Sequence, residues 1–213
     1  MREYLNKIRK PVKLNLKKCI VNSLLMFILG IVLGILSKWL DNLAIDNNIW
    51  WHNIIETLDL NNFFSNMGIW LFIAISISVY SKSPLRASIN VFVFFLGMCV
   101  SYHMYTILFS GFNPSEYMKI WYGLTIVSPL LAYIIWYSKS ESKVSIIINS
   151  IIMLIMITVC FSVGMFYFDI KSILDTLVFI GTVLVLYKRP TIFISIFIGL
   201  VLSFFIRIPY ISG

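Results

Sequence analysis

A long apolar segment that directly follows a basic turn constrains the fold more than any other feature of the chain. From Ser81 to Tyr105 the sequence reads SKSPLRASINVFVFFLGMCVSYHMY, and the apolar part extends from Ala87 to about Phe109. A helix of that length rises about 35 Å, which is enough to cross the roughly 30 Å hydrocarbon core of a bilayer. The segment therefore predicts a transmembrane helix.

The composition extends this prediction to the whole chain. Of the 213 residues, 60% are hydrophobic and 12% are charged, and the mean hydropathy is +0.91, whereas a soluble domain has about 25% charged residues. The net charge of +8 comes from Lys and Arg at predicted helix ends, where it sets membrane orientation. We expect the lipid bilayer as the partner and no nucleic acid. The abundance of Ile, Asn, Lys, Phe and Tyr suggests an AT-rich genome and hence a bacterial plasma membrane.

Hydropathy and turn residues divide the chain into an all-α bundle of seven predicted spans, with six as the alternative because the last two are short. The spans cover residues of about 19–40, 64–80, 87–109, 120–137, 144–167, 173–187 and 191–208. Of the 17 Lys and Arg residues, thirteen fall in the resulting inner segments and four in the outer ones. This bias predicts an inside N-terminus and an outside C-terminus.

Two regions are distinguished by this layout. Residues 1–18 form a basic cytoplasmic N-terminal segment, and residues 19–213 form a single transmembrane domain. Seven of the first 18 residues are Lys or Arg and no apolar core lies among them, so the first span is expected to serve as an uncleaved insertion signal.

The outer loop 42–62 carries acidic residues and no Lys or Arg, and it contains a predicted amphipathic helix in the outer interface. Apolar residues recur there at near-helical spacing, which leaves a wetter face of polar residues. The apolar residues are Trp50, Trp51, Ile54, Ile55 and Leu58, and the polar ones are His52, Asn53 and Glu56.

Small and polar residues predict which helix faces meet. Gly30 and Gly34 form a G-x-x-x-G contact in the first span, and Asn90, Gly97 and Ser101 share one stripe of the central helix. A second polar stripe lies on the opposite side of the central helix, so we expect this helix to lie between two others. That stripe consists of Ser88, Cys99 and His103.

Ionisable residues from several helices share the predicted depth of the outer interface. Such groups are candidates for function because charge is costly in lipid. Simpler interpretations stay open: His103 satisfied by a neighbouring hydroxyl or carbonyl, and Lys38 as an interfacial anchor paired with Asp41. The candidate outer polar cluster is Lys38, Asp41, His103, Glu116, Asp169 and Asp175.

Motifs of known catalytic or metal sites are missing from the sequence. There is no H-E-x-x-H, G-x-S-x-G or Walker lysine loop, and Cys19, Cys99 and Cys160 form no short-spaced pair. We therefore expect no enzyme activity, no cofactor and no metal site.

A short sequence recurs at two predicted inner turns. Tyr80 begins YSKS, and Tyr137 begins the same four residues 57 positions later; each is followed by a basic residue and a serine. Duplicated hairpins would produce this pattern, and so would convergence, because tyrosines and basic residues favour inner interfaces.

One stretch also resembles a known group of proteins. SKSPLRASINVFVFFLGMCVSYHMY, together with FFSNMGIW before it, resembles uncharacterised multi-pass membrane proteins of Gram-positive anaerobes over residues 60–140. The resemblance implies no established activity and no site residues.

These patterns suggest two classes of function. The first is a small transport-type protein, or the substrate-binding subunit of a transporter, which takes a small-molecule ligand from the outer side. The alternative is a non-transporting interaction, immunity or sensor subunit, in which the basic N-terminal segment engages a membrane protein partner or the protein forms a homo-oligomer.

Overall fold

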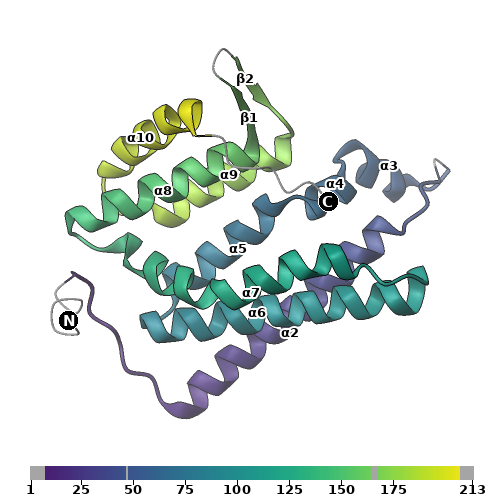
Figure 1. The fold of residues 1–213 in the computed structure, drawn as a ribbon, viewed down its shortest axis with the longest axis horizontal. Helices are drawn as coiled ribbons and strands as arrows, with labels where there is room; N and C mark the ends of the chain where they lie inside the picture. The colour runs from purple at the N-terminus through teal and green to yellow at the C-terminus, as the bar shows by residue number, and fades with distance from the viewer. Residues whose placement is uncertain (1–7, 47, 165–166, 207–213) are drawn as a thin grey trace.

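The computed structural model describes residues 8–46, 48–164 and 167–206, and this part of the chain is mainly helical (Figure 1). Turns of π-helix (Thr106–Ser110) and 3-10 helix (Trp136–Lys139) follow α6 and α7. The helices are α2 (Leu16–Asp41), α3 (Trp50–Thr57), α4 (Leu60–Ser65), α5 (Met67–Tyr80), α6 (Pro84–Tyr105), α7 (Ser115–Ile135), α8 (Lys143–Cys160), α9 (Ile173–Leu186) and α10 (Thr191–Phe205).

Four of the described helical segments are long and apolar enough to cross a membrane. They are Leu16–Asp41, Pro84–Ser110, Ser115–Lys139 and Lys143–Cys160. Helices α5, α9 and α10 are also apolar but have only 14 or 15 residues, which corresponds to a rise of about 21–23 Å. The apolar helices occupy the places of the predicted spans, and the chain has the character of a membrane protein.

The predicted span 144–167 is wrong in its outer part. Helix α8 ends at Cys160, and the chain continues as an antiparallel hairpin of β1 (Phe161–Gly164) and β2 (Tyr167–Ile170), in which Phe161 pairs with Ile170 (Figure 1). Residues 161–170 are rich in aromatic side chains, which favour strands over helices. The all-α prediction therefore holds except for this hairpin.

The predicted second span, 64–80, is interrupted near its start. Helix α4 ends at Ser65, Asn66 is extended with φ −76° and ψ 146°, and α5 begins at Met67. The indole N–H of Trp70 donates to the carbonyl of Phe64 at 2.9 Å and so satisfies a backbone group that the break leaves free.

The predicted amphipathic helix corresponds to α3, but the prediction that His52 lies on its solvent-facing side is wrong. Its imidazole is buried, accepts a hydrogen bond from the backbone N–H of Asp46 at 2.9 Å, and lies edge-on to Trp51. The loop before α3 folds back and needs an acceptor for this N–H, and His52 provides one. Trp50 is instead exposed.

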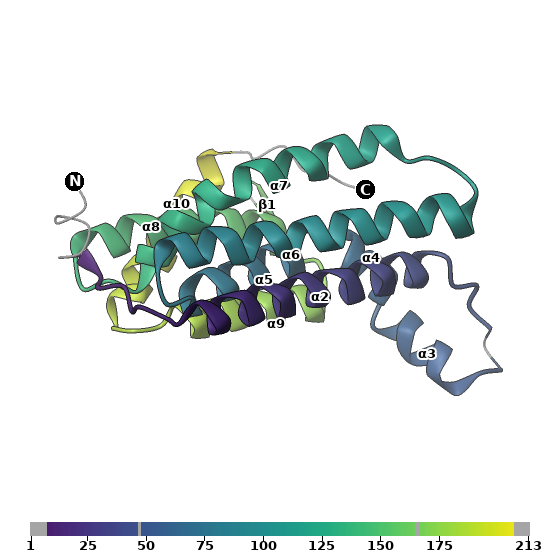
Figure 2. The same ribbon diagram turned by 90° about the horizontal axis from the view of Figure 1, so that it is seen from below.

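Helices α2 and α6 pack closely through residues without bulky side chains (Figure 2). A Cβ atom at Gly30 would overlap the carbonyl oxygen of Phe94, and one at Gly97 would lie 2.5 Å from the carbonyl oxygen of Phe27. Gly34 lies against Ser101 in the same way. These are the glycines for which the sequence predicts close helix packing.

The opposite side of α6 contacts α7 (Figure 2). The Ser88 hydroxyl donates to the carbonyl of Pro129 at 2.7 Å, and the Cys99 thiol lies 3.4 Å from the hydroxyl of Thr125. Helix α6 is therefore packed between α2 and α7, which confirms the central position predicted for it.

Helix α7 continues through Pro129, and a neighbouring hydroxyl replaces the missing backbone donor. Proline has no N–H to bond the carbonyl four residues earlier. That carbonyl belongs to Thr125, and the Ser128 hydroxyl donates to it at 2.8 Å.

Ser128→Ala should lower the free energy of unfolding by about 1 kcal/mol, because the buried Thr125 carbonyl then has no donor. In a Pro129→Ala background the same change should have almost no effect, since the new N–H at position 129 can donate to that carbonyl. Thermal unfolding in one detergent, measured for the wild type and these three variants, checks the difference. Equal losses in both backgrounds would contradict the assignment.

The predicted inner turns gather at one end of the bundle. The backbone N–H of Val12 donates to the carbonyl of Lys82 at 2.8 Å, and the ammonium of Lys188 donates to the carbonyl of Lys139 at 3.1 Å. At the other end the side chains of Asn42 and Ser110 bond each other. Turns with basic residues therefore lie at one end of the bundle, and the contact between Asn42 and Ser110 lies at the other. Each end contains a candidate site.

Candidate functional site

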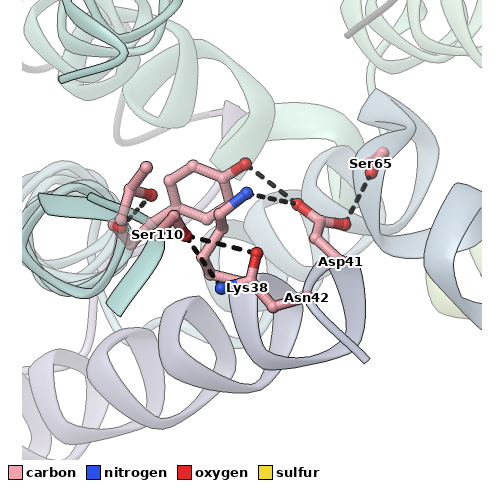
Figure 3. A network of polar contacts seen from close by, with 7 residues as sticks. Lys38, Asp41, Asn42, Ser65 and Ser110 are labelled. Atoms are coloured by element: carbon pink, nitrogen blue, oxygen red, sulfur yellow. Dashed lines mark hydrogen bonds and ion pairs between the residues drawn. The ribbon is translucent and has the colours of Figure 1, made fainter. Parts of the chain in front are cut away.

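The end of the bundle that holds the predicted outer loops contains a polar network centred on Asp41 (Figure 3). The Lys38 ammonium lies 3.6 Å from the Asp41 carboxylate, which also accepts hydrogen bonds from Tyr102 at 3.0 Å and Ser65 at 3.2 Å. Helical spacing predicts the first pair. Sequence reasoning missed Tyr102 and Ser65, because only tertiary packing brings α4 and α6 to the end of α2.

The polar groups of this network are occupied by contacts with one another, and little space is left for a ligand. Asn42 donates to the hydroxyl of Ser110 at 2.8 Å and so joins the end of α2 to the turn after α6 (Figure 3). The Lys38 side chain is only 10% exposed and its ammonium lies 5.5 Å from the Tyr102 ring centre. The neighbouring hollow, which Ser65 and Tyr102 help to line, has about 10 Å³, space for one water at most.

Two other residues of the predicted outer cluster lie apart from Asp41. The imidazole of His103 faces α7, with Nδ1 3.1 Å from the Tyr122 hydroxyl and Nε2 2.8 Å from the amide oxygen of Asn113. Glu116 forms an exposed ion pair with Lys119 in the first turns of α7. These contacts agree with the simpler interpretation of His103 as a satisfied polar side chain.

The remaining predicted residues lie near the β-hairpin. Asp169 is on β2, where its carboxylate accepts from the next backbone N–H. Asp175 is buried in the first turn of α9, and its Oδ1 lies near Gly68 of α5. Burial lowers the pKa of Lys171, which donates to the carbonyl of Val159. The six predicted residues thus occupy separate places, and only Lys38 and Asp41 meet.

The end of the bundle that holds the predicted inner turns contains a cavity of about 100 Å³ between the turns that precede α8 and α10. It shares Ser140, Glu141 and Lys188 with an adjoining hollow of about 550 Å³. We call the two together the inner basic cavity. Its charged lining residues are Arg9, Lys10, Lys139, Lys143, Lys188, Arg189 and Glu141.

Among the described residues, the charges of this lining are unbalanced, with six cations against a single carboxylate. Glu141 lies 3.4 Å from the Lys188 ammonium and 3.2 Å from the Arg189 guanidinium, and so connects the turns before α8 and α10. These pairs are exposed to solvent, where ion pairs are weak. The described lining residues keep a formal excess of five positive charges.

Arg9 joins the N-terminal segment to this cavity. Its guanidinium donates to the carbonyls of Val79 and Trp136, at the ends of α5 and α7, and lies 4.2 Å above the Trp136 ring. Carbonyls at helix C-termini attract a cation. Burial lowers the pKa of Arg9. The segment around Arg9 is therefore docked, whereas residues 1–7 of the predicted basic segment lie outside the described chain.

Two buried polar side chains line the cavity without a hydrogen-bond partner for one of their atoms among the described residues. They are Ser138, through its hydroxyl oxygen, and Asn149, through its amide oxygen. Ser138 is 2% exposed and Asn149 is 7% exposed. The YSKS repeat marks Ser138 as a turn residue, but nothing in the sequence shows that it would line a cavity.

The described residues contain no group of three or more His, Cys, Asp or Glu side chains that could hold a metal ion. The inner basic cavity can bind an anion through charge and hydrogen-bond donors.

In the comparisons with known proteins, no family model, curated protein or solved structure matches the chain.

Proposed function

We propose that the protein is a seven-span integral membrane protein of a bacterial plasma membrane that acts by binding a ligand or partner at its cytoplasmic end. This makes it a membrane interaction or sensor subunit. The observation that carries the proposal is the inner basic cavity, which combines excess positive charge with buried polar groups that lack partners in the described chain.

The outer end gives less support to a transport-type function. Lys38 and Asp41 are engaged with each other and with neighbouring hydroxyl groups, and the hollow beside them has about 10 Å³. His103 and Asp175 lie on other sides of the bundle. Uptake of a solute from the outer side therefore stays a prediction from the sequence.

The charge distribution supports the cytoplasmic location of the cavity. The turns that carry Lys82, Lys139 and Lys188 come together at one end through backbone and side-chain contacts. Basic residues near membrane spans favour the cytoplasmic side. The shorter helices α5, α9 and α10 are included as spans because, along the chain, they alternate in direction with the longer ones (Figure 1).

A pair of photo-reactive substitutions tests this function in living cells. A photo-crosslinking amino acid at Lys10, on the rim of the inner basic cavity, should give adducts with cytoplasmic molecules, because this end is the proposed binding end. The same amino acid at exposed Lys119, on the outer end, should give none. Adducts from position 119 alone would contradict the proposal, as would labelling of Lys82→Cys by an impermeant thiol reagent outside intact cells.

A further inference from the structure

We infer that the inner basic cavity binds a phosphate group, carried either by a lipid headgroup or by a soluble phosphorylated molecule. The inference rests on the proposed function, because it names the ligand class of the same site. Four features of the described residues support it: charge, two helix N-termini, two polar groups without partners, and a comparison with the first YSKS turn.

The charged groups suit a phosphate. Lys143, Lys188 and Arg189 line the smaller hollow, and Arg9, Lys10 and Lys139 lie around the adjoining one. A guanidinium can donate two parallel hydrogen bonds to phosphate oxygens, and an ammonium adds a compact charge. The only carboxylate among the described lining residues, that of Glu141, is already shared between Lys188 and Arg189.

Two helices begin at this cavity. The first residues of α8 and α10, Lys143 and Thr191, both line it, and neither N-cap side chain accepts a hydrogen bond from the helix. Some of these first N–H groups are already used, because those of Ser145, Ile192 and Phe193 donate to the carbonyls of Ser142, Arg189 and Pro190. The positive dipole end of each helix still favours anions. An anion in the cavity would therefore face two such ends at once.

The buried polar groups are an observation independent of charge. The Ser138 hydroxyl can donate to a phosphate oxygen, while the amide oxygen of Asn149 requires a donor. A protonated phosphate oxygen or a ligand hydroxyl next to the phosphate would meet that requirement. Neither atom has a hydrogen-bond partner in the part of the chain that the structure describes, although both residues are more than nine-tenths buried.

After the first YSKS turn, side chains of the protein supply the donors that Asn149 lacks after the second. Asn90 is the seventh residue of α6, as Asn149 is of α8. The amide oxygen of Asn90 accepts from the Ser23 hydroxyl at 2.9 Å and from the Arg86 guanidinium at 3.3 Å. After the second turn, the described chain supplies no such donors to Asn149, and a cavity is present instead.

The size of the cavity agrees with this ligand class. One water molecule takes about 30 Å³ of liquid volume, and the smaller hollow has about 100 Å³. A phosphate group fits this space, and the adjoining hollow of about 550 Å³ leaves room for the rest of a larger ligand.

Thermal unfolding of the purified full-length protein in a neutral detergent tests the inference with inorganic phosphate as the probe. Sodium chloride of equal ionic strength is the reference. Phosphate at about ten times its dissociation constant should raise the wild-type Tm by about 3–6 °C. The Ser138→Ala and Lys143→Gln variants should each need at least about tenfold more phosphate for the same shift, the loss expected for a missing hydrogen bond to a charged group.

The control is Lys82→Gln, which removes the exposed lysine of the first YSKS turn and leaves the cavity lining intact. Its response to phosphate should equal that of the wild type. Ser138→Ala should not lower the Tm without phosphate, because its hydroxyl has no partner in the described chain. A weaker response in this variant therefore reports ligand binding and not misfolding.

A second arm distinguishes the sources of the phosphate. The same variants are unfolded in nanodiscs of phosphatidylcholine alone or mixed with phosphatidylglycerol. Stabilisation by the anionic lipid that Ser138→Ala weakens supports a headgroup ligand, and stabilisation by free phosphate alone supports a soluble one. The inference is overturned if neither probe exceeds its reference, or if Lys82→Gln loses as much response as Lys143→Gln. If crosslinking from Lys10 nevertheless succeeds, cytoplasmic binding stands and only the ligand class fails.

Discussion

Replacing Asp41 by leucine is expected to lower the free energy of unfolding by about 3–5 kcal/mol, the cost of breaking a buried ion pair by removing one partner. The carboxylate faces the ammonium of Lys38 and accepts hydrogen bonds from Tyr102 and Ser65. Its removal leaves a charge on a lysine side chain that is only 10% exposed. Urea unfolding in a fixed detergent would measure the loss.

An exposed ion pair with the same spacing is the matched control. Glu116 and Lys119 are also three residues apart, but their side chains are 84% and 69% exposed. Pairs of this kind contribute about 0–1 kcal/mol, so Glu116→Leu should change stability little. An equal loss for Asp41→Leu and Glu116→Leu would show that burial of the Lys38 pair has no energetic consequence.

The double variant Lys38→Met/Asp41→Leu separates charge from packing. Replacing both partners of a buried pair by apolar residues is often neutral or stabilising, so the double variant should recover more than half of the loss. It should also keep its response to phosphate, because the inner basic cavity lies at the other end of the bundle. A lost response would show that the polar network around Asp41 is coupled to phosphate binding.

Hydropathy predicted the positions of the apolar helices because the bilayer imposes a length that a one-dimensional pattern can show. The same pattern failed from residue 161 onward in the predicted span 144–167, because a short apolar segment fits a strand as well as a helix. It also missed the break at Asn66, because the carbonyl of Phe64 is satisfied by the side chain of Trp70 and not by the backbone.

Side-chain chemistry was predictable only where both partners belong to one helix. Lys38 and Asp41 are three residues apart, so their pairing follows from helical geometry. Tyr102 and Ser65 join them from other helices. The inner basic cavity was not predicted for the same reason: Ser138 and Arg189 are distant in sequence and come together only when the turns before α8 and α10 meet.

Gly30→Ala is expected to be the most damaging single-methyl addition among the helix-packing residues, with a loss at the upper end of the roughly 1–3 kcal/mol typical of overpacking. The added Cβ would overlap the backbone carbonyl of Phe94, and it would lie 3.0 Å from the N atom of Met98. Backbone atoms in a packed helix cannot rotate away as a flexible side chain can. The helices α2 and α6 must therefore separate along this contact.

Gly123→Ala in α7 provides the comparison, because a Cβ there would meet nothing within 4 Å. Alanine is also the better helix former, so this change should leave the Tm unchanged or raise it slightly. Tryptophan fluorescence during heating measures both variants in the same detergent. If Gly30→Ala unfolds at the same temperature as Gly123→Ala, the close approach of α2 to α6 is wrong. In that case α6 would not lie between α2 and α7 as described, and Arg86 and Ser23 would not pack around Asn90. That packing is what distinguishes the first YSKS turn from the second, which has the cavity.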